Sequence, residues 1–355
     1  MKIMHVCETV TGGIATYLNN VAGEQLRHPD VSGVSLVLPA AQREEIALGT
    51  AVRIHDFPGE SRPQRLRHLA TRLSAAVTAE RPDVVHVHST FAGLVCRALP
   101  LSLGGAKLVY QPHGVAFDPH RVGGLKRRAI QWVERALYAR SDALVAISEY
   151  EQTLLNAAGM GERTLLIKNC VRDTREHLVS ADKEDFYLFI GRFDRQKGFD
   201  RLYASWGEAH GELRVVGGSV VDAGTAFAPK ANMHLLGWLD NASLDGLIAR
   251  AKALIVPSRW EGFGLVVLEA YRNATPVICS NRGALPELVR DGETGQVFDF
   301  DDFAPSLDAA LARFEASDRE AMGRRCRERY EREFSPASMN AALLKLYRSS
   351  EHCYV

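Results

Sequence analysis

The most constraining feature of this sequence is the regular alternation of short, apolar, β-branched runs with stretches of helical pattern. The first series of these runs lies at residues 3–7, 34–38, 84–88, 107–110, 143–147 and 164–167. A chain in which strands and helices alternate builds right-handed βαβ units, because each helix brings the next strand back parallel to the last. The first part of the chain is therefore predicted to form an α/β domain around a parallel sheet.

The alternation pauses once and then starts again. Residues 169–184 are polar and charged with little apolar content, which is typical of a linker. A second series of strand-like runs follows at residues 187–190, 213–216, 233–236, 253–256 and 276–279. Because 355 residues exceed what one hydrophobic core usually organises, we expect two α/β domains. Their predicted bounds are 1–172 and 173–335, followed by a C-terminal helical segment, 336–355.

Composition excludes several classes of protein. Hydrophobic residues make up 46% and charged residues 24%, values typical of a soluble enzyme rather than a disordered or membrane-spanning chain. Lys plus Arg and Asp plus Glu both number 43, so a globally basic nucleic-acid binder is disfavoured. The six cysteines form no C-x-x-C pair, which argues against a zinc module and fits free thiols. The N-terminus lacks the pattern of an export signal, so we expect a cytoplasmic protein.

Basic residues gather in the first half of the chain, mainly in two predicted helices at residues 62–80 and 124–140. The basic members are Arg62, Arg65, Arg67 and Arg72 in the first helix and Lys126, Arg127, Arg128, Arg135 and Arg140 in the second. Two interpretations are open. These helices present solvated faces, or they are drawn to an anionic membrane leaflet by about 1 kcal/mol per basic residue.

Loops that follow strand ends are where an open α/β sheet binds its ligands. The first such loop, residues 8–13, ends in Gly12 and Gly13 immediately before a predicted helix. Paired glycines let the backbone approach a ligand, and the N-terminus of the following helix attracts negative charge. The loop lacks the G-x-G-x-x-G pattern of a dinucleotide site. A ligand contact and a plain tight turn are both consistent with it.

The most informative segment is residues 257–270, with the sequence PSRWEGFGLVVLEA. An apolar strand ends here in a Pro/Ser loop, and the Gly-Phe-Gly turn opens a helix whose first N–H groups converge on one point. Glu261 lies just before this turn, and Glu269 lies within the apolar helix. An unpaired carboxylate there would cost several kcal/mol, so we expect Glu269 to have a partner.

Two further strand ends carry polar residues. Residues 191–198, GRFDRQKG, follow the first strand of the second domain. Their Arg192 and Lys197 can converge on a diphosphate, where fixed cations neutralise a leaving group. In the first domain, His113 follows a strand and would face the second domain across a cleft. A lone histidine is more often structural than catalytic, but this position favours a ligand contact.

Together these motifs resemble the signature of retaining nucleotide-sugar glycosyltransferases of family 4. The run from Glu261 to Glu269 is similar to the family's E-G-F-G-L-x-x-L-E element, and residues 191–198 are similar to its G-R-x-x-x-x-K-G element. The His113–Gly114 pair matches its His-Gly. The resemblance implies a GT-B fold, in which two Rossmann-like parallel-sheet domains face each other and a C-terminal helix crosses back to the first domain.

The resemblance also implies a role for each matched residue. Glu261 would contact hydroxyls of the donor sugar, Arg192 and Lys197 would bind its pyrophosphate, and His113 would lie near the reacting carbon. Glu269 would hold the ribose. The other donor-binding positions implied are Gly12, Gly13, Gly262, Phe263, Gly264 and Leu265.

We expect no metal or other cofactor. His86 and His88 alternate along one strand, and such a pair could bind a metal, but no third ligand is evident. We therefore predict that they lie at a strand end and line the floor of the cleft. Asp299 and Asp301 form a D-x-D in an acidic run before a helix, and we assign them to helix capping.

The expected reaction is transfer of a sugar from a nucleoside diphosphate, uridine being favoured over guanosine, to a hydroxyl acceptor with retention of configuration. Because both glutamates have binding roles, a front-side mechanism without a protein nucleophile fits best. The resemblance implies a glycan or lipid-linked acceptor in bacterial surface polysaccharide synthesis, with residues 62–80 and 124–140 at the inner face of the plasma membrane. A nucleotide-sugar 2-epimerase of the same fold and a noncatalytic nucleotide-binding protein are the alternatives.

Overall fold

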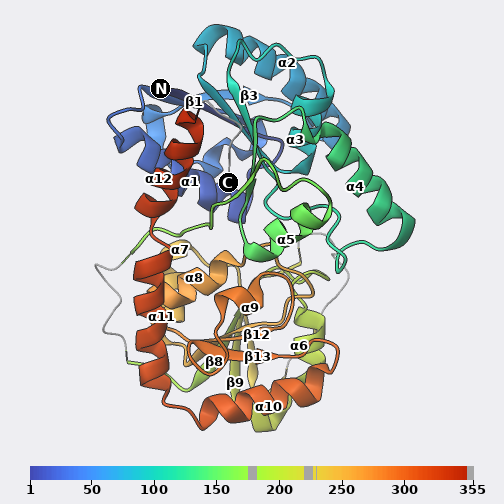
Figure 1. Cartoon of the computed structure of the whole chain (residues 1–355). Coiled ribbons are helices and arrows are strands. Elements are labelled where there is room, and N and C mark those ends of the chain that lie inside the picture. Colours follow the sequence, from blue (N-terminus) through green and yellow to red (C-terminus); the bar gives the residue numbers. More distant parts are fainter. Residues whose placement is uncertain (175–181, 220–226, 229, 350–355) are drawn as a thin grey trace. The chain divides into compact units, whose positions relative to one another are not determined.

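The computed structural model describes residues 1–174, 182–219, 227–228 and 230–349. Residues 175–181, in the middle of the predicted linker, lie outside the described residues. The chain divides into two compact units: unit 1 comprises residues 1–171 together with the C-terminal segment that begins at Pro336, and unit 2 comprises Arg172–Ser335. Each unit contains one parallel sheet flanked by helices, which confirms the predicted fold class (Figure 1).

Unit 1 contains a seven-stranded sheet in the order β3-β2-β1-β4-β5-β6-β7, all parallel. Its strands are β1 (Lys2–Cys7), β2 (Gly33–Pro39), β3 (Arg53–Phe57), β4 (Val84–His88), β5 (Lys107–Gln111), β6 (Ala143–Ala146) and β7 (Thr164–Leu166). Its α-helices are α1 (Gly13–Arg27), α2 (Arg62–Glu80), α3 (Thr90–Ala98), α4 (Gly124–Tyr138), α5 (Glu149–Ala157) and α12 (Pro336–Arg348), and two 3₁₀ turns are Ala40–Glu45 and Gly49–Ala51. The predicted helix at 124–140 thus ends at Tyr138.

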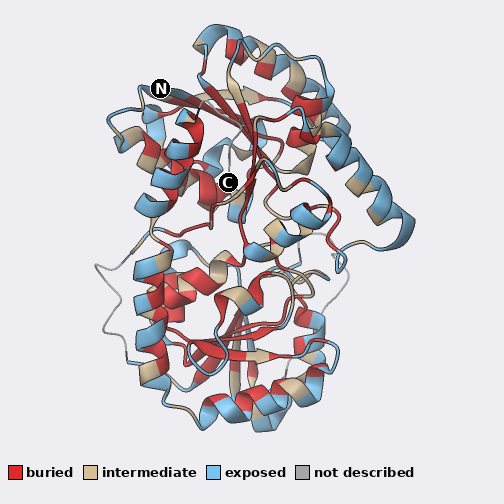
Figure 2. Cartoon of the chain, viewed as in Figure 1, coloured by how far each residue is buried: buried red, intermediate tan, exposed pale blue. Residues whose placement is uncertain are grey.

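The two faces of this sheet have separate cores, because successive side chains of a strand point to opposite faces. On β1, Ile3 and Cys7 belong to a buried cluster with α1 and α12, whereas Met4 and Val6 belong to one with α2 and α3. Figure 2 shows the strands buried and the helices exposed on their outer sides. The C-terminal helix α12 therefore completes unit 1, as the predicted fold class requires.

Unit 2 contains a six-stranded parallel sheet in the order β10-β9-β8-β11-β12-β13. Its strands are β8 (Phe186–Ile190), β9 (Glu212–Val216), β10 (Met233–Gly237), β11 (Ala253–Val256), β12 (Val277–Ser280) and β13 (Gly295–Phe298). Its helices are α6 (Phe199–Ser205), the 3₁₀ turn Glu208–His210, α7 (Asn241–Arg250), α8 (Leu265–Arg272), α9 (Leu285–Leu288), α10 (Phe303–Glu315) and α11 (Arg319–Glu333). Aromatic residues from β8, α6 and α10 dominate its core.

In both sheets the strand order reverses once, between β1 and β4 in unit 1 and between β8 and β11 in unit 2. Connections on the two sides of such a point leave in opposite directions, so a crevice forms beyond the strand ends and is the usual ligand site of an open sheet. None of the helices in the described ranges has the length and apolarity that crossing a bilayer requires. The five described cysteines are buried and free.

Candidate active site

The two strongest sequence motifs meet at the switch point of unit 2. Residues 191–198 follow β8, residues 257–264 follow β11, and these two strands are neighbours in the sheet. The backbone N–H of Arg259 donates to the carbonyl of Gln196 (2.8 Å), and the amide of Gln196 donates to the carbonyl of Trp260 (3.3 Å). The two loops are therefore joined along their length.

Glycine at position 198 allows this close approach. Gly198 has a φ of 71°, and an added Cβ would lie 2.0 Å from the carbonyl oxygen of Pro257. Any other side chain would push the two loops apart. A bidentate ion pair between Arg259 and Asp200, at 2.7 Å for both contacts, holds the same junction from the α6 side.

At the centre of this junction lies an ion pair between Lys197 and Glu261. Lys197 Nζ donates to Glu261 Oε2 at 2.6 Å, and the hydroxyl of Ser258 donates to the same oxygen at 3.3 Å. The Glu261 side chain is 10% exposed and that of Lys197 is 22% exposed. Breaking a pair this buried leaves an uncompensated charge, which is strongly destabilising. The structure thus brings together two residues that the sequence places 64 positions apart.

A third loop, which the sequence did not reveal, closes over Glu261. After β12, the backbone N–H of Ala284 donates to the Glu261 carbonyl at 3.0 Å. Gly283 has a φ of 60°, and an added Cβ would lie 2.1 Å from that carbonyl oxygen. No sequence pattern marked this glycine, because its constraint comes from a neighbour 22 residues earlier in the chain.

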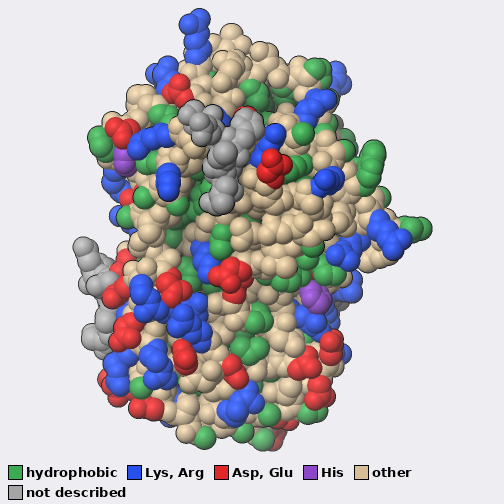
Figure 3. Space-filling view, in the orientation of Figure 1, with side chains coloured by type: hydrophobic (Ala, Val, Ile, Leu, Met, Phe, Trp, Pro, Cys, Tyr) green, Lys and Arg blue, Asp and Glu red, His purple; other side chains and the backbone are tan. Residues whose placement is uncertain are grey.

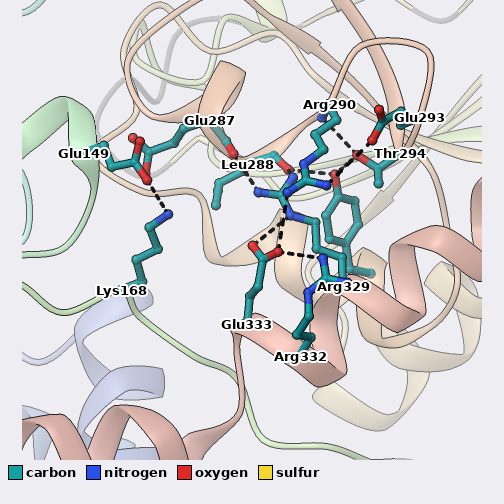
Figure 4. A network of polar contacts seen from close by, with 11 residues as sticks. Glu149, Lys168, Glu287, Leu288, Arg290, Glu293, Thr294, Arg329, Arg332 and Glu333 are labelled. Carbon is teal, nitrogen blue, oxygen red and sulfur yellow. Dashed lines mark hydrogen bonds and ion pairs between the residues drawn. The ribbon is translucent and has the colours of Figure 1, made fainter.

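Helix α9, which follows this loop, is fixed by a polar network centred on Arg329 (Figure 4). Arg329 of α11 donates to the carbonyls of Glu287 (2.8 Å) and Leu288 and pairs with Glu333 at 3.1 Å. The Tyr271 hydroxyl, from α8, also donates to the Leu288 carbonyl at 3.0 Å. The end of α9 is thus tied to α8 and α11, and the loop beside Glu261 is held with it.

The cation of Arg192 lies at the surface and is already paired. Its side chain is 45% exposed, and it contacts Asp194 at 2.9 Å and the amide oxygen of Gln196 at 3.3 Å. Asp194 also accepts from the backbone N–H of Lys197 at 3.0 Å. An anion that binds both Arg192 and Lys197 must therefore compete with Asp194 and Glu261.

The N-terminus of α8 is open to a ligand. Gly264 is its N-cap, with a φ of 99°, and it provides no side chain to accept from the first N–H groups of the helix. Leu265 and Val266 are partly exposed, whereas Phe263, Val267 and Leu268 are buried. Unpaired N–H groups at a helix N-terminus attract anions, and here Lys197 and Glu261 lie on the preceding loops.

Glu269 differs from our expectation. We predicted a protein partner for it, but among the described residues its carboxylate has no hydrogen-bond or ion-pair partner. The side chain escapes the expected cost because it is partly exposed. Burial nevertheless raises the pKa of its carboxyl, an effect that Arg272 opposes. An unsatisfied, partly desolvated carboxylate is suited to accept hydrogen bonds from ligand hydroxyls.

The glycine turn after β9 and the segment at the end of β10 are also adjacent in unit 2. The N–H of Gly217 donates to the carbonyl of Gly237 at 2.9 Å, and a Cβ at Gly218 would lie 3.2 Å from the indole nitrogen of Trp238. Trp238 is 58% exposed. The turn after β9 therefore has an exposed aromatic ring beside it.

In unit 1, His113 follows β5 in a strained conformation. Its φ is 55°, in the left-handed region that residues other than glycine rarely adopt, and Gly114 follows with a φ of 114°. The N–H of Gly114 is held by the buried Glu151 carboxylate at 2.9 Å. Such strain persists where surrounding contacts fix it, and it clusters at functional sites. Burial lowers the pKa of the His113 imidazole to about 3.

The prediction for His86 and His88 is wrong on two points. Both are fully buried, so they do not line an open strand end. A third candidate for a metal ligand is also present, because the adjacent strand β1 places His5 beside them, and one nitrogen from each ring lies within 4.8 Å of the others. Sequence reasoning missed it because His5 and His86 are neighbours only through the strand register.

Gly12 and Gly13 are exposed at the N-terminus of α1, where Gly12 is the N-cap with a φ of 55° and no side chain caps the helix. The nearby Glu8, 2% exposed, pairs with Arg65 of α2 at 3.0 Å and with Arg62 at 3.5 Å. Two of the four arginines predicted to give α2 a basic face are therefore paired with Glu8, which lies in the loop after β1.

The capping role predicted for Asp299 and Asp301 is also wrong. The N-cap of α10 is Asp302, which makes no side-chain cap. Asp299 instead accepts from Asn281 at 2.9 Å, and Asp301 pairs with Arg282. These carboxylates bind the loop that leads to Gly283.

Two glycosyltransferase family models match this chain. The family model described as "Glycosyl transferases group 1" matches residues 171–330, which include the Lys197–Glu261 junction, and "Glycosyl transferase 4-like domain" matches residues 12–170. An uncharacterised 41.2 kDa protein from the cps region of Klebsiella pneumoniae is 30% identical, and the match covers 98% of this chain and all of that protein. The chain therefore belongs to the GT-B glycosyltransferases of the family 4 type.

Other similarities are more distant. A glycogen synthase of Mycobacterium tuberculosis is 30% identical over 61% of this chain and 56% of its own length. Among solved structures, a sucrose-phosphate synthase from Thermosynechococcus elongatus aligns with a TM-score of 0.79 at 23% identity over 98% of both chains. HepE from Anabaena in complex with UDP-glucose aligns with a TM-score of 0.74 at 17% identity over 98% of this chain and 99% of its own. At these identities the two structures share the GT-B fold with this chain.

Proposed function

We propose that this glycosyltransferase moves a sugar from a nucleoside diphosphate to a hydroxyl acceptor with retention of anomeric configuration. The observation that carries the proposal is the junction of unit 2, where Lys197, Glu261 and the uncapped N-terminus of α8 occupy adjacent loops. One end of this site offers positive charge to a diphosphate, and the other offers carboxylate oxygens to sugar hydroxyls.

Each residue has a proposed part in the reaction. Lys197, Arg192 and the first N–H groups of α8, around Gly264 and Leu265, stabilise the negative charge that develops on the leaving diphosphate. Glu261 accepts hydrogen bonds from sugar hydroxyls. When a donor arrives, its phosphates replace Glu261 as a partner of Lys197 and Asp194 as a partner of Arg192. The two released carboxylates keep hydrogen bonds, Asp194 from the backbone N–H of Lys197 and Glu261 from the sugar hydroxyls.

Glu269, with no protein partner among the described residues, is proposed to hold the ribose. His113 is proposed to contact the donor sugar, and Gly12, Gly13, Gly262 and Phe263 to supply backbone contacts. No carboxylate then remains to attack the anomeric carbon, so we propose that the acceptor hydroxyl attacks on the face from which the diphosphate leaves. Its proton passes to the departing phosphate oxygen. In this scheme fixed cations do the work of a metal, so the reaction needs none.

We propose a UDP-sugar as the donor and a glycan or lipid-linked glycan as the acceptor, in bacterial surface polysaccharide synthesis. HepE from Anabaena is seen with UDP-glucose, and WaaG, which aligns with a TM-score of 0.69 at 16% identity, is described as involved in lipopolysaccharide biosynthesis. The Klebsiella relative is named for a cps region. These names support the proposal for this chain by analogy alone.

We also propose that the enzyme works in the cytoplasm, at the inner face of the plasma membrane, and that α4 is the element that touches the lipid. Leu125, which is 81% exposed, directly precedes the basic residues 126–128 of the helix. Trp132, which is 72% exposed, lies between these residues and Arg135. Figure 3 shows hydrophobic and basic side chains together over this helix. An exposed apolar stripe flanked by cations is the pattern of an interfacial helix.

The membrane part is tested with vesicles. Lys126→Glu with Arg128→Glu should abolish co-sedimentation with anionic vesicles and leave transfer to a short soluble acceptor intact. Arg127 is spared, because its side chain holds the Phe117 carbonyl. Arg319→Glu with Arg324→Glu, on α11, is the matched control. Wild-type protein that ignores anionic vesicles at low salt, where screening is weakest, would contradict the role of α4.

The reaction is tested in two steps. Melting temperature is measured with UDP, GDP and ADP, since a ligand at a hundred times its dissociation constant stabilises by about 2.7 kcal/mol. The preferred nucleotide's sugars are then incubated with glycan acceptors, and the anomeric configuration of the product is determined by NMR. Release of an epimerised sugar without any transfer would favour the 2-epimerase alternative, and binding without turnover of any donor would favour a noncatalytic protein.

A further inference from the structure

A continuous line of hydrogen bonds runs through unit 1 from α1 to His113. Gln25 Oε1 lies 2.8 Å from His5 Nε2, His5 Nδ1 lies 2.9 Å from His88 Nε2, and His88 Nδ1 lies 2.9 Å from His113 Nε2. The line thus joins one amide and three imidazoles through both nitrogens of His5 and of His88. We call it the histidine chain.

The strand register builds this chain. β1 and β4 are neighbours with His5 opposite His86 and Cys7 opposite His88, so all three histidines point to the face covered by α1 and α12. β5 lies on the other side of β4, with Gln111 opposite His88, and His113 follows two residues later. The histidine chain therefore crosses the switch point of the sheet and ends where unit 1 offers its strand ends to a ligand.

The surroundings keep these rings neutral. Gln25, His5 and His88 are fully buried beside the apolar cluster that α1 and α12 form with the sheet. Burial, the largest cause, lowers the pKa of His5 to about 4 and that of His88 well below its usual range. Among the described residues, the titratable side chains in ring contact with the histidine chain are Tyr17 and His86, and Tyr347 contacts His86 in turn. Burial raises the pKa of both tyrosine hydroxyls, which stay protonated, and lowers the pKa of His86.

Neutrality gives the histidine chain a direction. A neutral imidazole has one N–H donor and one bare acceptor nitrogen. Because the oxygen of Gln25 can only accept, His5 must donate from Nε2 and accept at Nδ1. His88 must then donate from Nε2 and accept at Nδ1, and His113 must donate from Nε2 to His88. One acceptor on α1 thus fixes which nitrogen carries the proton at a ring three hydrogen bonds away.

We propose that Gln25, His5 and His88 are positioning residues that hold His113 as the Nε2–H tautomer, leaving its Nδ1 bare to accept a hydrogen bond from a hydroxyl of the bound sugar. The contact with sugar rests on the proposed function, whereas the tautomer rests on the hydrogen bonds of unit 1 alone. The strained backbone of His113 supports the proposal, since surrounding contacts must hold this residue at a φ that it would not adopt by itself.

A metal site is the competing explanation of the same histidines, because His5, His86 and His88 can each direct a nitrogen to one point. In the structure, however, His5 Nδ1 and His88 Nε2 are joined by a hydrogen bond. A metal would have to displace the proton between them and break the histidine chain. The two explanations therefore predict different protonation states for His88.

The test is the tautomer itself, read by NMR from the ¹⁵N shifts of histidine-labelled full-length protein. Protonated and bare nitrogens of a neutral ring have separate shifts, and substitution of each histidine in turn assigns them. We expect Nε2–H and bare Nδ1 for His5, His88 and His113 at neutral pH. An Nδ1–H form of His113 would overturn the proposal, and so would loss of the His88 Nε2 proton on adding Zn²⁺ to the wild type.

Two variants at Gln25 separate direction from packing. Gln25→Met keeps the shape but removes the acceptor, so the Nδ1–H form of His113 should appear beside the original. Gln25→Glu keeps an acceptor and should keep the wild-type tautomer. An unchanged His113 in Gln25→Met would show that Gln25 does not set the direction, which refutes the proposal even if Gln25→Glu fails to fold.

Kinetics then separate this inference from the proposed function. Gln25→Met should lower kcat about three- to tenfold, the value of one ordinary hydrogen bond, and Gln25→Glu should recover it. If the tautomers are as expected but no donor is turned over, the proposed function fails while the histidine chain stands. If donors are turned over and His113 carries its proton on Nδ1, the inference fails and the proposed function stands.

Discussion

The two glutamates of unit 2 should respond in opposite ways to the loss of their charge. Glu269 has no partner among the described residues of the unliganded protein, whereas Glu261 is bound to Lys197 at 2.6 Å. The substitutions Glu269→Gln and Glu261→Gln preserve shape and remove one negative charge each. Their effects on nucleotide binding and on transfer test the division of roles directly.

For Glu269→Gln we expect weaker binding of the nucleotide itself. A hydrogen bond to a charged group contributes about 1.5–3 kcal/mol, so losing the charge should raise the dissociation constant of UDP about 10- to 150-fold. Because burial raises the pKa of this carboxyl, affinity in the wild type should fall with decreasing pH earlier than an ordinary glutamate would allow. The carboxylate is needed to accept from the ribose, and protonation removes it.

For Glu261→Gln we expect UDP to bind as well as in the wild type, or better. The phosphates must compete with Glu261 for Lys197, and the neutral amide competes less. Transfer should nevertheless fall about 10²- to 10³-fold, the usual consequence of removing one fixed electrostatic contact from a transition state.

For each variant, calorimetry measures the dissociation constant of UDP, and a transfer assay measures the rate of turnover. Glu320→Gln, whose side chain is 87% exposed on α11, is the control. Equal losses of affinity and of turnover in the two variants would refute the division of roles. A Glu261→Gln variant that loses UDP binding would show that the Lys197–Glu261 pair holds the loops together instead of competing with phosphate.

Three further predictions concern charge. Lys197→Met and Arg192→Ala should each lower kcat about 10²-fold, and normal turnover in both would place the diphosphate elsewhere. Transfer should survive EDTA, and complete loss that Mg²⁺ restores would require a metal. Because the His5 pKa falls from 6.5 to about 4 on folding, the unfolded chain binds the extra proton between these values, so unit 1 should lose about 3 kcal/mol as pH drops from 6.5 to 4. Hydrogen exchange of the β1 amides measures this, and pH-independent protection would contradict the buried, neutral His5.

The parts of the fold that follow local pattern were predictable. Central strands are apolar on both faces, so β1, β4, β8 and β11 were found from short β-branched runs. The strands β3 (Arg53–Phe57) and β13 (Gly295–Phe298) were not, because polar residues and a glycine interrupt their apolar pattern, as the sequences RIHDF and GQVF show. Their place depends on the sheet that they join.

The residues of the site also divide into those that local sequence pattern predicts and those that depend on the folded sheet. Glu261, Lys197 and Arg192 could be identified because the glycines around them keep a fixed spacing in the chain. The close approach of Gly283 to Glu261 could not, and neither could the meeting of His5 with His88. Both depend on which strands are neighbours and in which register, and that information is spread over the whole chain. The prediction of a protein partner for Glu269 was wrong because burial of its side chain was judged from helical pattern alone.

The return of α12 to unit 1 has a consequence for how the protein is made. Met339, Leu343 and Tyr347 of α12 lie in the same buried cluster as Ile3 and Val34, so part of the core of unit 1 is missing until α12 leaves the ribosome. Unit 2 is continuous in sequence and can fold while unit 1 waits for α12. At about 5–20 residues per second, that wait is about 10 to 30 s, during which the apolar face beneath α12 is exposed to chaperones and to other nascent chains.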